Sequence, residues 1–281
     1  MSRVRGRTLS KPKRITAWTV ILLLIFGSWG GNLWYYRSMQ LEEPLFLKSY
    51  VSMSAGHGRS LELVYLENRY GSKKVTGVQI DELPELSFTL SNWNNGTYQT
   101  VMKAYAGFNA QGEEPPIKSP VTVKEVTVFY SEGPPRKVPI GEITILPDSD
   151  VELVDFYSSM ASSDRTGYNY GTMMKPAVLE RIDFTYSDRL KPYLHLYLSD
   201  KPIESLKYPI SKQKGDGLSL SYKWEIPLDN PMAYVDYQPE CRLEFRLKDG
   251  QRVTQSFRIN VNFNLTDEQM KRLVRSGGEP Q

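Results

Sequence analysis

A long apolar run near the N-terminus is the strongest feature of the hydropathy pattern. Residues Ile15–Tyr36 include no Asp, Glu, Lys, Arg or His, and the run is bounded by Arg14 and Arg37. A helix rises about 1.5 Å per residue and the hydrocarbon core of a bilayer is roughly 30 Å thick, so a helix of this length can cross it. We therefore expect a transmembrane helix at residues 15–36 that contacts the lipid bilayer.

The charges on either side of this run predict its orientation. Residues 1–14 contain six basic residues and no acidic residue, whereas Arg37 is soon followed by Glu42 and Glu43. An excess of basic residues is retained on the cytoplasmic side of a membrane. We expect a single-pass signal-anchor protein of the cell membrane, with its N-terminus cytoplasmic and its C-terminus extracytoplasmic.

A cleaved signal peptide is the alternative interpretation of the same run. Ile15–Phe26 alone is long enough for the apolar core of a signal peptide. Ser28 and Gly30 are small residues of the kind that precede a cleavage site, but Trp29 and the aromatic residues after it fit such a site poorly. The pattern favours an anchor that is not cleaved.

Beyond the apolar run, short segments of alternating apolar and polar residues predict β-strands rather than helices. A turn is expected at Ser91–Gly96 and an irregularity in a strand at Lys124–Glu125. One helix is expected at Asp267–Val274, capped by Thr266. The expected strands are 45–53, 60–66, 75–80, 86–90, 97–105, 121–130, 137–146, 151–157, 178–186, 193–198, 218–226, 242–247 and 253–263.

The number and spacing of these strands are typical of β-sandwiches. We expect a mainly β protein with two immunoglobulin-like or related β-sandwich domains at residues 45–147 and 148–264, although a single large domain stays open. The pattern resembles that of immunoglobulin-like sandwiches but lacks their Cys…Trp…Cys signature. Residues 265–281 are expected to form the short helix and a frayed tail. Ser158–Met174 is expected to be a long irregular loop.

Composition changes this picture in two ways. The formal net charge is +3, but residues 1–14 alone contribute six positive charges, so the remainder is slightly acidic with interspersed charges of both signs. Such a surface argues against nucleic acid as a partner. The single cysteine, Cys241, excludes an internal disulfide and is expected in a strand core, with an intermolecular disulfide as the other possibility.

The residues that usually carry catalysis or bind metals do not form a motif. There are two histidines, His57 and His195, and no nucleophile elbow or Cys-x-x-Cys pair. Asp148, Asp150 and Asp155 cluster near the expected domain boundary, but without the spacing of a calcium loop. We expect no catalytic residue, metal site or cofactor.

Aromatic residues in polar segments are the best candidates for binding. Trp93 lies within Ser91–Gly96, and Tyr168 and Tyr170 lie within Ser158–Met174. Exposed aromatic side chains stack on sugars or anchor protein interfaces, because a large face is buried at little cost in conformational entropy. The alternative is that these side chains fold back onto the core.

The expected function follows from the anchor and these aromatic residues. We expect a membrane-anchored, extracytoplasmic binding or assembly module without catalysis of its own, with a protein partner at the outer membrane face and glycan as the other ligand class. The alternative is an envelope hydrolase or glycan-processing enzyme, whose carboxylate pair the sequence does not reveal. A purely structural spacer is a third interpretation.

Overall fold

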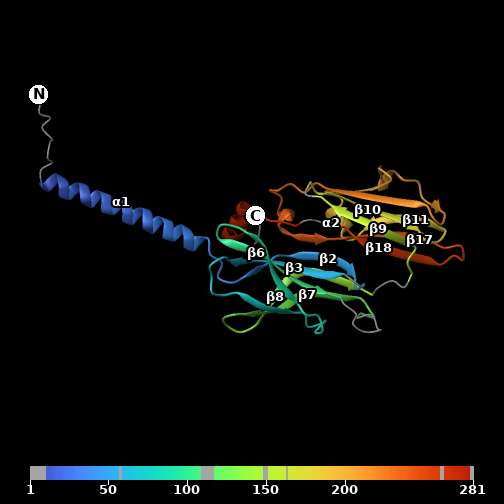
Figure 1. Cartoon of the computed structure of the whole chain (residues 1–281), viewed down its shortest axis with the longest axis horizontal. Coiled ribbons are helices and arrows are strands. Elements are labelled where there is room, and N and C mark those ends of the chain that lie inside the picture. Colours follow the sequence, from blue (N-terminus) through green and yellow to red (C-terminus); the bar gives the residue numbers. More distant parts are fainter. Residues whose placement is uncertain are drawn as a thin grey trace, which may run out of the picture.

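The computed structural model describes residues 11–56, 59–108, 117–147, 151–162, 164–259 and 263–278, with only the backbone for residues 11–17. Figure 1 shows one long helix that leads into a body built mainly of strands. The N-terminal helix and the strands are therefore separate parts of the structure. The predicted mainly β fold with a short C-terminal helix is confirmed.

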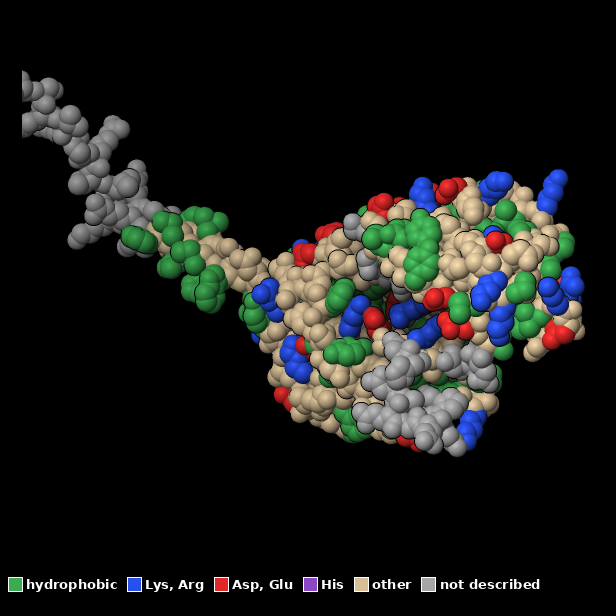
Figure 2. Space-filling model, turned by 45° about the vertical axis from the view of Figure 1, so that its right-hand side comes forward, with side chains coloured by type: hydrophobic (Ala, Val, Ile, Leu, Met, Phe, Trp, Pro, Cys, Tyr) green, Lys and Arg blue, Asp and Glu red, His purple; other side chains and the backbone are tan. Residues whose placement is uncertain are grey.

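Helix α1 (Lys11–Ser38) contains the whole expected span 15–36 and extends beyond it at both ends. Figure 2 shows apolar side chains along its described part, whereas acidic and basic side chains of both signs cover the β-strand body. Among the described residues, no helix is long and apolar enough to cross a membrane.

The first sandwich consists of two sheets that share one core. Apolar residues of both sheets, such as Leu63 and Tyr65 in one and Val51 and Ile143 in the other, are buried against each other. The first sheet has the order β1 (Leu45–Phe46), β3 (Ser60–Asn68), β6 (Gln99–Gly107), β5 (Thr89–Asn95). The second has the order β16 (Asp236–Gln238), β2 (Ser49–Ser54), β8 (Arg136–Leu146), β7 (Val121–Tyr130), β4 (Val75–Gln79).

The second sandwich likewise consists of two sheets that share one core. Its core combines Leu196 and Trp224 of one sheet with Leu179, Cys241 and Phe245 of the other. One sheet has the order β13 (Lys201–Pro202), β12 (Leu194–Leu198), β15 (Gly217–Trp224), β10 (Thr166–Met173), β9 (Val154–Ala161). The other has the order β14 (Ile210–Lys212), β11 (Ala177–Phe184), β17 (Glu240–Arg246), β18 (Arg252–Arg258).

Short helices complete the chain: α2 (Ser187–Leu190), the 3₁₀ helices η1 (Ile203–Ser205) and η2 (Pro231–Tyr234), and α3 (Asp267–Arg275). Thr266 caps α3 in a reciprocal capping box with Gln269, as the sequence predicts. Helix α3 lies against the first sandwich, because Met270 and Leu273 are buried with Val64 and Val101 of β3 and β6. Helix α3 therefore lies beside β6 (Figure 1).

Strand β16 crosses from one sandwich to the other. It precedes β17 of the second sandwich in sequence, yet it pairs in parallel with β2 of the first, with Tyr237 opposite Tyr50. Strand β2 in turn pairs in parallel with β8. The two sandwiches are thus joined by backbone hydrogen bonds within one sheet as well as by side chains.

Two turn or loop predictions are wrong. The expected turn Ser91–Gly96 lies mostly within β5, and the chain reverses at Gly96, whose N–H donates to the Gln99 carbonyl. The expected loop Ser158–Met174 is instead a hairpin of β9 and β10. The irregularity at Lys124–Glu125 is confirmed by a register shift between β7 and β8.

The sequence pattern does not predict the hairpin, because most inward positions of β10 are small or polar. Gly167, Asn169 and Gly171 are three of its four buried positions, and only Met173 is apolar, so the segment has no apolar alternation. A Cβ at Gly167 would lie 2.2 Å from the Tyr222 ring, so only glycine leaves room for that neighbouring side chain. Packing partners far away in sequence therefore specify this strand.

We predict that Gly141→Ala destabilises the protein more than Gly133→Ala does. Both glycines have positive φ values, +94° and +92°. A Cβ at Gly141 would lie 2.4 Å from the Ser49 carbonyl oxygen, whereas a Cβ at Gly133 would have no described atom within 4 Å. Both substitutions carry the same cost of a positive φ. The difference between their unfolding free energies therefore measures the steric clash at Gly141, which we expect to be at least about 2 kcal/mol. Urea denaturation of both variants measures it, and equal losses would contradict the close packing of β8 on β2.

Candidate binding surface

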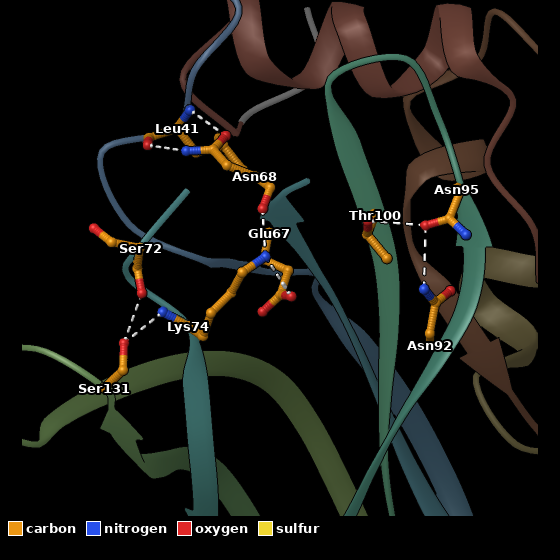
Figure 3. Close-up of polar contacts among 9 residues, drawn as sticks. All are labelled: Leu41, Glu67, Asn68, Ser72, Lys74, Asn92, Asn95, Thr100 and Ser131. Atoms are coloured by element: carbon orange, nitrogen blue, oxygen red, sulfur yellow. Dashed lines mark hydrogen bonds and ion pairs between the residues drawn. The ribbon is translucent and has the colours of Figure 1, made fainter. Parts of the chain in front are cut away.

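The C-terminal end of α1 is fixed to the first sandwich. Met39 is buried, and its carbonyl accepts a hydrogen bond from the Gln99 side chain. The Asn68 amide pairs with the backbone of Leu41 in both directions, at 2.9 Å from the Leu41 nitrogen and 2.7 Å to its oxygen (Figure 3). The Asn68 side chain thus bonds to the Leu41 backbone as a neighbouring strand would, and it holds the segment that follows α1.

Aromatic contacts reinforce this attachment. The rings of Tyr35 and Tyr36 meet the Tyr98 ring edge to face, with centroids 6.1 and 6.0 Å apart. Arg275 of α3 donates a hydrogen bond to the Tyr35 hydroxyl at 3.2 Å. The end of α1 therefore contacts both the β5–β6 turn and helix α3, and the direction in which α1 leaves the body is set by packing.

A polar cluster beside the helix attachment holds the start of β4. Lys74 donates to the Glu67 carboxylate at 2.9 Å and also to the Asn68 carbonyl. The Ser131 hydroxyl accepts from the Lys74 backbone and donates to the Ser72 carbonyl, each at 2.9 Å. Figure 3 shows these contacts on one side and the Asn92–Asn95–Thr100 contacts of β5 and β6 on the other.

A buried carboxylate, Glu240, joins the two sandwiches. Its Oε1 accepts hydrogen bonds from the Ser54 N–H at 3.0 Å, the Ser54 hydroxyl at 3.2 Å and the Arg59 guanidinium at 2.9 Å. The side chain is fully buried, and its Oε2 has no hydrogen-bond partner within the described residues. Removal of Arg59 would leave an uncompensated buried charge, so the loss of this partner is expected to destabilise the junction strongly.

A second polar group lies on β16 in the same junction. Burial raises the pKa of Asp236 from its ordinary value of 3.8 to about 6, against the opposing effects of a hydrogen bond from Gln238 and the charge of Arg258. Arg258 also donates to the Gln238 side chain and, at 3.3 Å, to the Ser60 carbonyl. Glu62 and Lys103 are the other charges that act on Asp236.

Aromatic side chains close the junction. Tyr50 stacks on Tyr237 with centroids 5.4 Å apart, and the Arg189 guanidinium lies 4.4 Å from the Tyr50 ring centroid. The Tyr186 hydroxyl donates to the Val51 carbonyl at 2.8 Å. Because these contacts come from both sandwiches, the junction resembles a packed core more than a hinge.

The β9–β10 hairpin presents an exposed apolar surface, which we call the hairpin patch: Tyr157, Met160, Tyr168 and Tyr170. Tyr168 lies opposite Met160 in the register, and its hydroxyl is 3.4 Å from the Met160 sulfur. The Tyr168 and Tyr170 ring centroids are 4.8 Å apart. Tyr157 is the most exposed, at 68%. Met160, Tyr168 and Tyr170 therefore lie together on the hairpin, and Tyr157 is exposed on the same edge strand as Met160.

Trp93 lies on the other sandwich. It is 52% exposed on β5, also an edge strand, and the Lys103 ammonium lies 3.8 Å from its ring centroid. Trp93 and Tyr157 share a backbone feature: each is the extra residue at a register shift, between Asn92 and Asn94 and between Phe156 and Ser158. Such bulges redirect side chains and disturb edge pairing.

The three candidate residues from the sequence thus separate into two places. Tyr168 and Tyr170 are neighbours in the hairpin patch, whereas Trp93 belongs to a different sheet. The sequence pattern does not single out Tyr157 or Met160, because Tyr157 falls at the end of an expected strand and Met160 in an expected loop. Their partnership depends on the β9–β10 register. Whether any of them binds a partner stays a prediction.

The other candidates from the sequence have structural surroundings. Burial raises the pKa of the Cys241 thiol well above its ordinary value, so the thiol stays protonated within the core. His195 lies 3.4 Å from the Glu225 carboxylate on a sheet surface. His57, Asp148 and Asp150 lie outside the described residues. Among those described, no group of three or more His, Cys, Asp or Glu is arranged to hold a metal ion.

Two clefts open on the body. One, with about 1660 Å³ of empty space that includes open solvent, follows residues 40–48 below the helix attachment and reaches Arg136, Tyr234 and Val274. The other lies at the end of β15. Neither cleft is lined by Trp93 or by any residue of the hairpin patch. The exposed aromatic residues therefore lie outside both of these clefts.

Comparisons with known proteins assign no family. No family model matches the sequence, and no curated protein matches it. Among solved structures, the YadV chaperone is similar with a TM-score of 0.24 and 11% identity, covering 77% of this chain and 100% of that chain. Cadherin domains 1–4 of protocadherin gamma B7 give a TM-score of 0.26 and 11% identity, covering 77% and 50%. Scores this low carry no argument about function.

We predict that Asp236 makes the protein less stable as the pH rises from 3.8 to about 6. The pKa of Asp236 is higher in the folded state than in the unfolded state, so the fold is stabilised while this carboxyl is protonated. The stabilisation is fully present below pH 3.8, and it is lost as the pH rises through about 6. The loss is roughly 3 kcal/mol. Urea denaturation across this range measures it.

Asp236→Asn is expected to remove that slope, because the amide keeps an oxygen acceptor for Gln238 and does not ionise. Asp200→Asn, on an exposed turn, serves as the control and is expected to keep the slope. An unchanged slope in Asp236→Asn would show that another group in the junction titrates instead.

Proposed function

We propose that this chain is a membrane-anchored, extracytoplasmic binding or assembly module without catalysis of its own. In this proposal, residues 15–36 cross the membrane, residues 1–14 are cytoplasmic, and two β-sandwich domains at 45–147 and 148–264 stand at the outer face. The observation that carries the proposal is the exposure of apolar side chains on all sides of α1, with Trp29 77% exposed.

The physical argument concerns the surroundings that α1 requires. A helix that is apolar on one side packs against a core, whereas a helix that is apolar all round needs apolar surroundings on every side. Each fully exposed Leu, Ile or Phe costs roughly 1.5–3 kcal/mol relative to burial. The described residues 18–36 are all exposed, so a bilayer is the surrounding that removes this cost.

The attachments of α1 and of the two sandwiches support a role in assembly. Asn68 fixes the helix end to the first sandwich, and Glu240 fixes the first sandwich to the second. The hairpin patch would then stand at a set position relative to the membrane. Tyrosine and methionine are enriched in protein interfaces, so a protein is the favoured partner.

The alternative hydrolase requires two carboxyl groups that converge in an accessible cleft. Three carboxyls among the described residues are buried, Glu67, Asp236 and Glu240, and none of them lines either of the two clefts. The larger cleft is lined by Glu42 and Glu43, and Glu43 is already held in two ion pairs. The geometry therefore favours a binding module.

The anchor is tested by alkaline carbonate extraction of membranes from cells that express the full chain. We expect the chain to stay in the pellet and the double variant Leu23→Arg, Ile25→Arg to be released, because each central arginine costs about 2.5–3.5 kcal/mol on insertion. Tyr70→Arg, on an exposed turn of the body, is the control and should stay in the pellet. Release of the unaltered chain would contradict the anchor.

The partner surface is tested by a photo-crosslinking residue placed at Tyr157 of the membrane-bound chain. We expect a defined protein adduct that falls at least about tenfold in Tyr168→Ala and Tyr170→Ala, because interface aromatic residues are often worth 2 kcal/mol or more. Tyr105→Ala, 41% exposed on the first sandwich, is the control. An adduct unaffected by both hairpin variants, or glycan binding alone, would contradict a protein partner at this patch.

A further inference from the structure

The larger cleft lies below the helix attachment and has no role in the function proposed above. It follows residues 40–48, and about 740 Å³ of its space is wide enough to hold a water-sized sphere. Ligand sites in proteins commonly enclose roughly 300–1,000 Å³. Neither Trp93 nor any residue of the hairpin patch lines this cleft, so a ligand here would occupy a second, separate surface.

The cleft lies where β8 lacks a strand on one side. Residues 136–139 of β8 pair with β7, but the pairing of β8 with β2 begins only at Gly141. Within the described part of the chain, residues 136–140 therefore have a neighbouring strand on one side only. Arg136, Val138 and Pro139 of this unpaired portion line the cleft.

The path of the segment before β2 explains the open position. Strand β2 pairs with β8 from Ser49 onward, and a straight continuation of β2 toward the N-terminus would lie beside residues 136–140. Instead the preceding residues form β1, which pairs with β3 in the opposite sheet of the first sandwich. The chain thus changes sheets just before Ser49. Residues 44–48 then line the other side of the cleft.

The unpaired portion of β8 is suited to an added strand. Five residues of extended chain span about 17 Å, and an added strand lies about 4.8 Å from its neighbour. Every residue in 136–140 except Pro139 keeps a backbone N–H, and all of them keep a carbonyl that can accept. Val138 and Leu45 are half-buried in the lining, so they offer apolar contacts to alternate side chains of such a strand.

The same sheet already takes up a strand from outside the first sandwich. Strand β16 belongs to the part of the chain that forms the second sandwich, yet it pairs in parallel with the edge of β2 that faces away from β8. In strand addition, backbone hydrogen bonds supply the affinity and contacts to alternate side chains supply the selectivity. An open strand position within a cleft therefore favours an extended polypeptide as the occupant.

We propose that this cleft binds an extended segment of a partner protein, which pairs with residues 136–140 of β8 and places alternate apolar side chains against Val138 and Leu45. The lining of the cleft begins at Gln40, close after the last residue of α1, Ser38. The kind of partner rests on the proposed function: with α1 in the membrane, the cleft lies near the bilayer surface, within reach of the segment that flanks another protein's membrane-spanning helix.

The test begins with selection from a phage library of random heptapeptides on the full chain in a neutral detergent. We expect the enriched sequences to carry apolar residues at alternate positions. A fluorescein-labelled synthetic form is expected to bind with a Kd of about 100 μM or tighter, measured by fluorescence anisotropy. Because this experiment needs no membrane, its failure is distinct from a failure of the carbonate extraction that tests the anchor.

N-methylated forms of the selected peptide test for strand pairing. Successive N–H groups of an extended peptide point to opposite edges, so methylation of the odd-numbered residues blocks one edge and methylation of the even-numbered residues blocks the other. Because the added strand pairs with β8 through one edge, one form should bind at least about tenfold more weakly than the other. Equal affinities of the two forms would contradict strand addition.

A thiol in the cleft locates the binding. Val138→Cys is labelled with N-phenylmaleimide after folding, so that the added ring occupies the position of the strand, while Cys241 stays buried. We expect labelling to weaken binding of the peptide at least about tenfold. Lys137→Cys, labelled in the same way, is the matched control, because Lys137 lies on the same strand and does not line the cleft. Equal binding by both labelled variants would overturn the proposal.

Two other outcomes would also overturn it. Enrichment of no peptide from the library would show that the cleft takes up no extended chain. A phospholipid that native mass spectrometry finds on the full chain, and that labelled Val138→Cys loses, would assign the cleft to a lipid. The melting temperature of each variant is measured alongside, so that weaker binding is assigned to the cleft only when the fold is retained.

Discussion

Strand β16 forms its backbone hydrogen bonds with β2, although nearly two hundred residues separate them and β17, the next strand after β16, belongs to the other sandwich. This pairing makes the junction part of a sheet. Side chains then enclose it: Tyr237 of β16 stacks on Tyr50 of β2, and Glu240, just after β16, receives the Arg59 guanidinium and both donors of Ser54. A domain contact made only by side chains could slide, whereas a paired strand fixes the register.

The junction concentrates most of the buried charge discussed above. Glu240 and Asp236 are both buried, and removing a carboxylate from water is unfavourable unless hydrogen bonds replace the solvent. Glu240 receives three such bonds on one oxygen, while Asp236 is left with a raised pKa. The arrangement thus favours a specific relation between the sandwiches more than maximal stability.

A continuous set of contacts extends from α1 to the far sandwich. Asn68 holds the end of α1 and belongs to β3, a strand of the first sandwich. The pairing of β16 with β2 joins the first sandwich to the second sandwich. The C-terminal helix α3 packs on the first sandwich, and its Arg275 donates a hydrogen bond to the Tyr35 hydroxyl. The hairpin patch on the second sandwich would therefore be held at a fixed position relative to the helix.

Several features follow from the sequence alone, because each depends on residues close together in the chain. The apolar run of α1, the alternation of strands such as β7 and β12, and the Thr266 cap of α3 are set by local periodicity and local hydrogen bonds. The interpretation of Cys241 as a core residue was equally local, since Leu243 and Phe245 alternate with it.

Only the tertiary structure decided the rest. The sequence pattern predicts a loop at β10, because three of its four buried positions are Gly167, Asn169 and Gly171. Distant partners such as the Tyr222 ring beside Gly167 specify this strand, rather than the hydrophobicity of its own residues. The pairing of β16 with β2 and the pairing of Met160 with Tyr168 likewise depend on long-range register. Sequence periodicity reports which way a side chain faces, whereas long-range register decides what it meets.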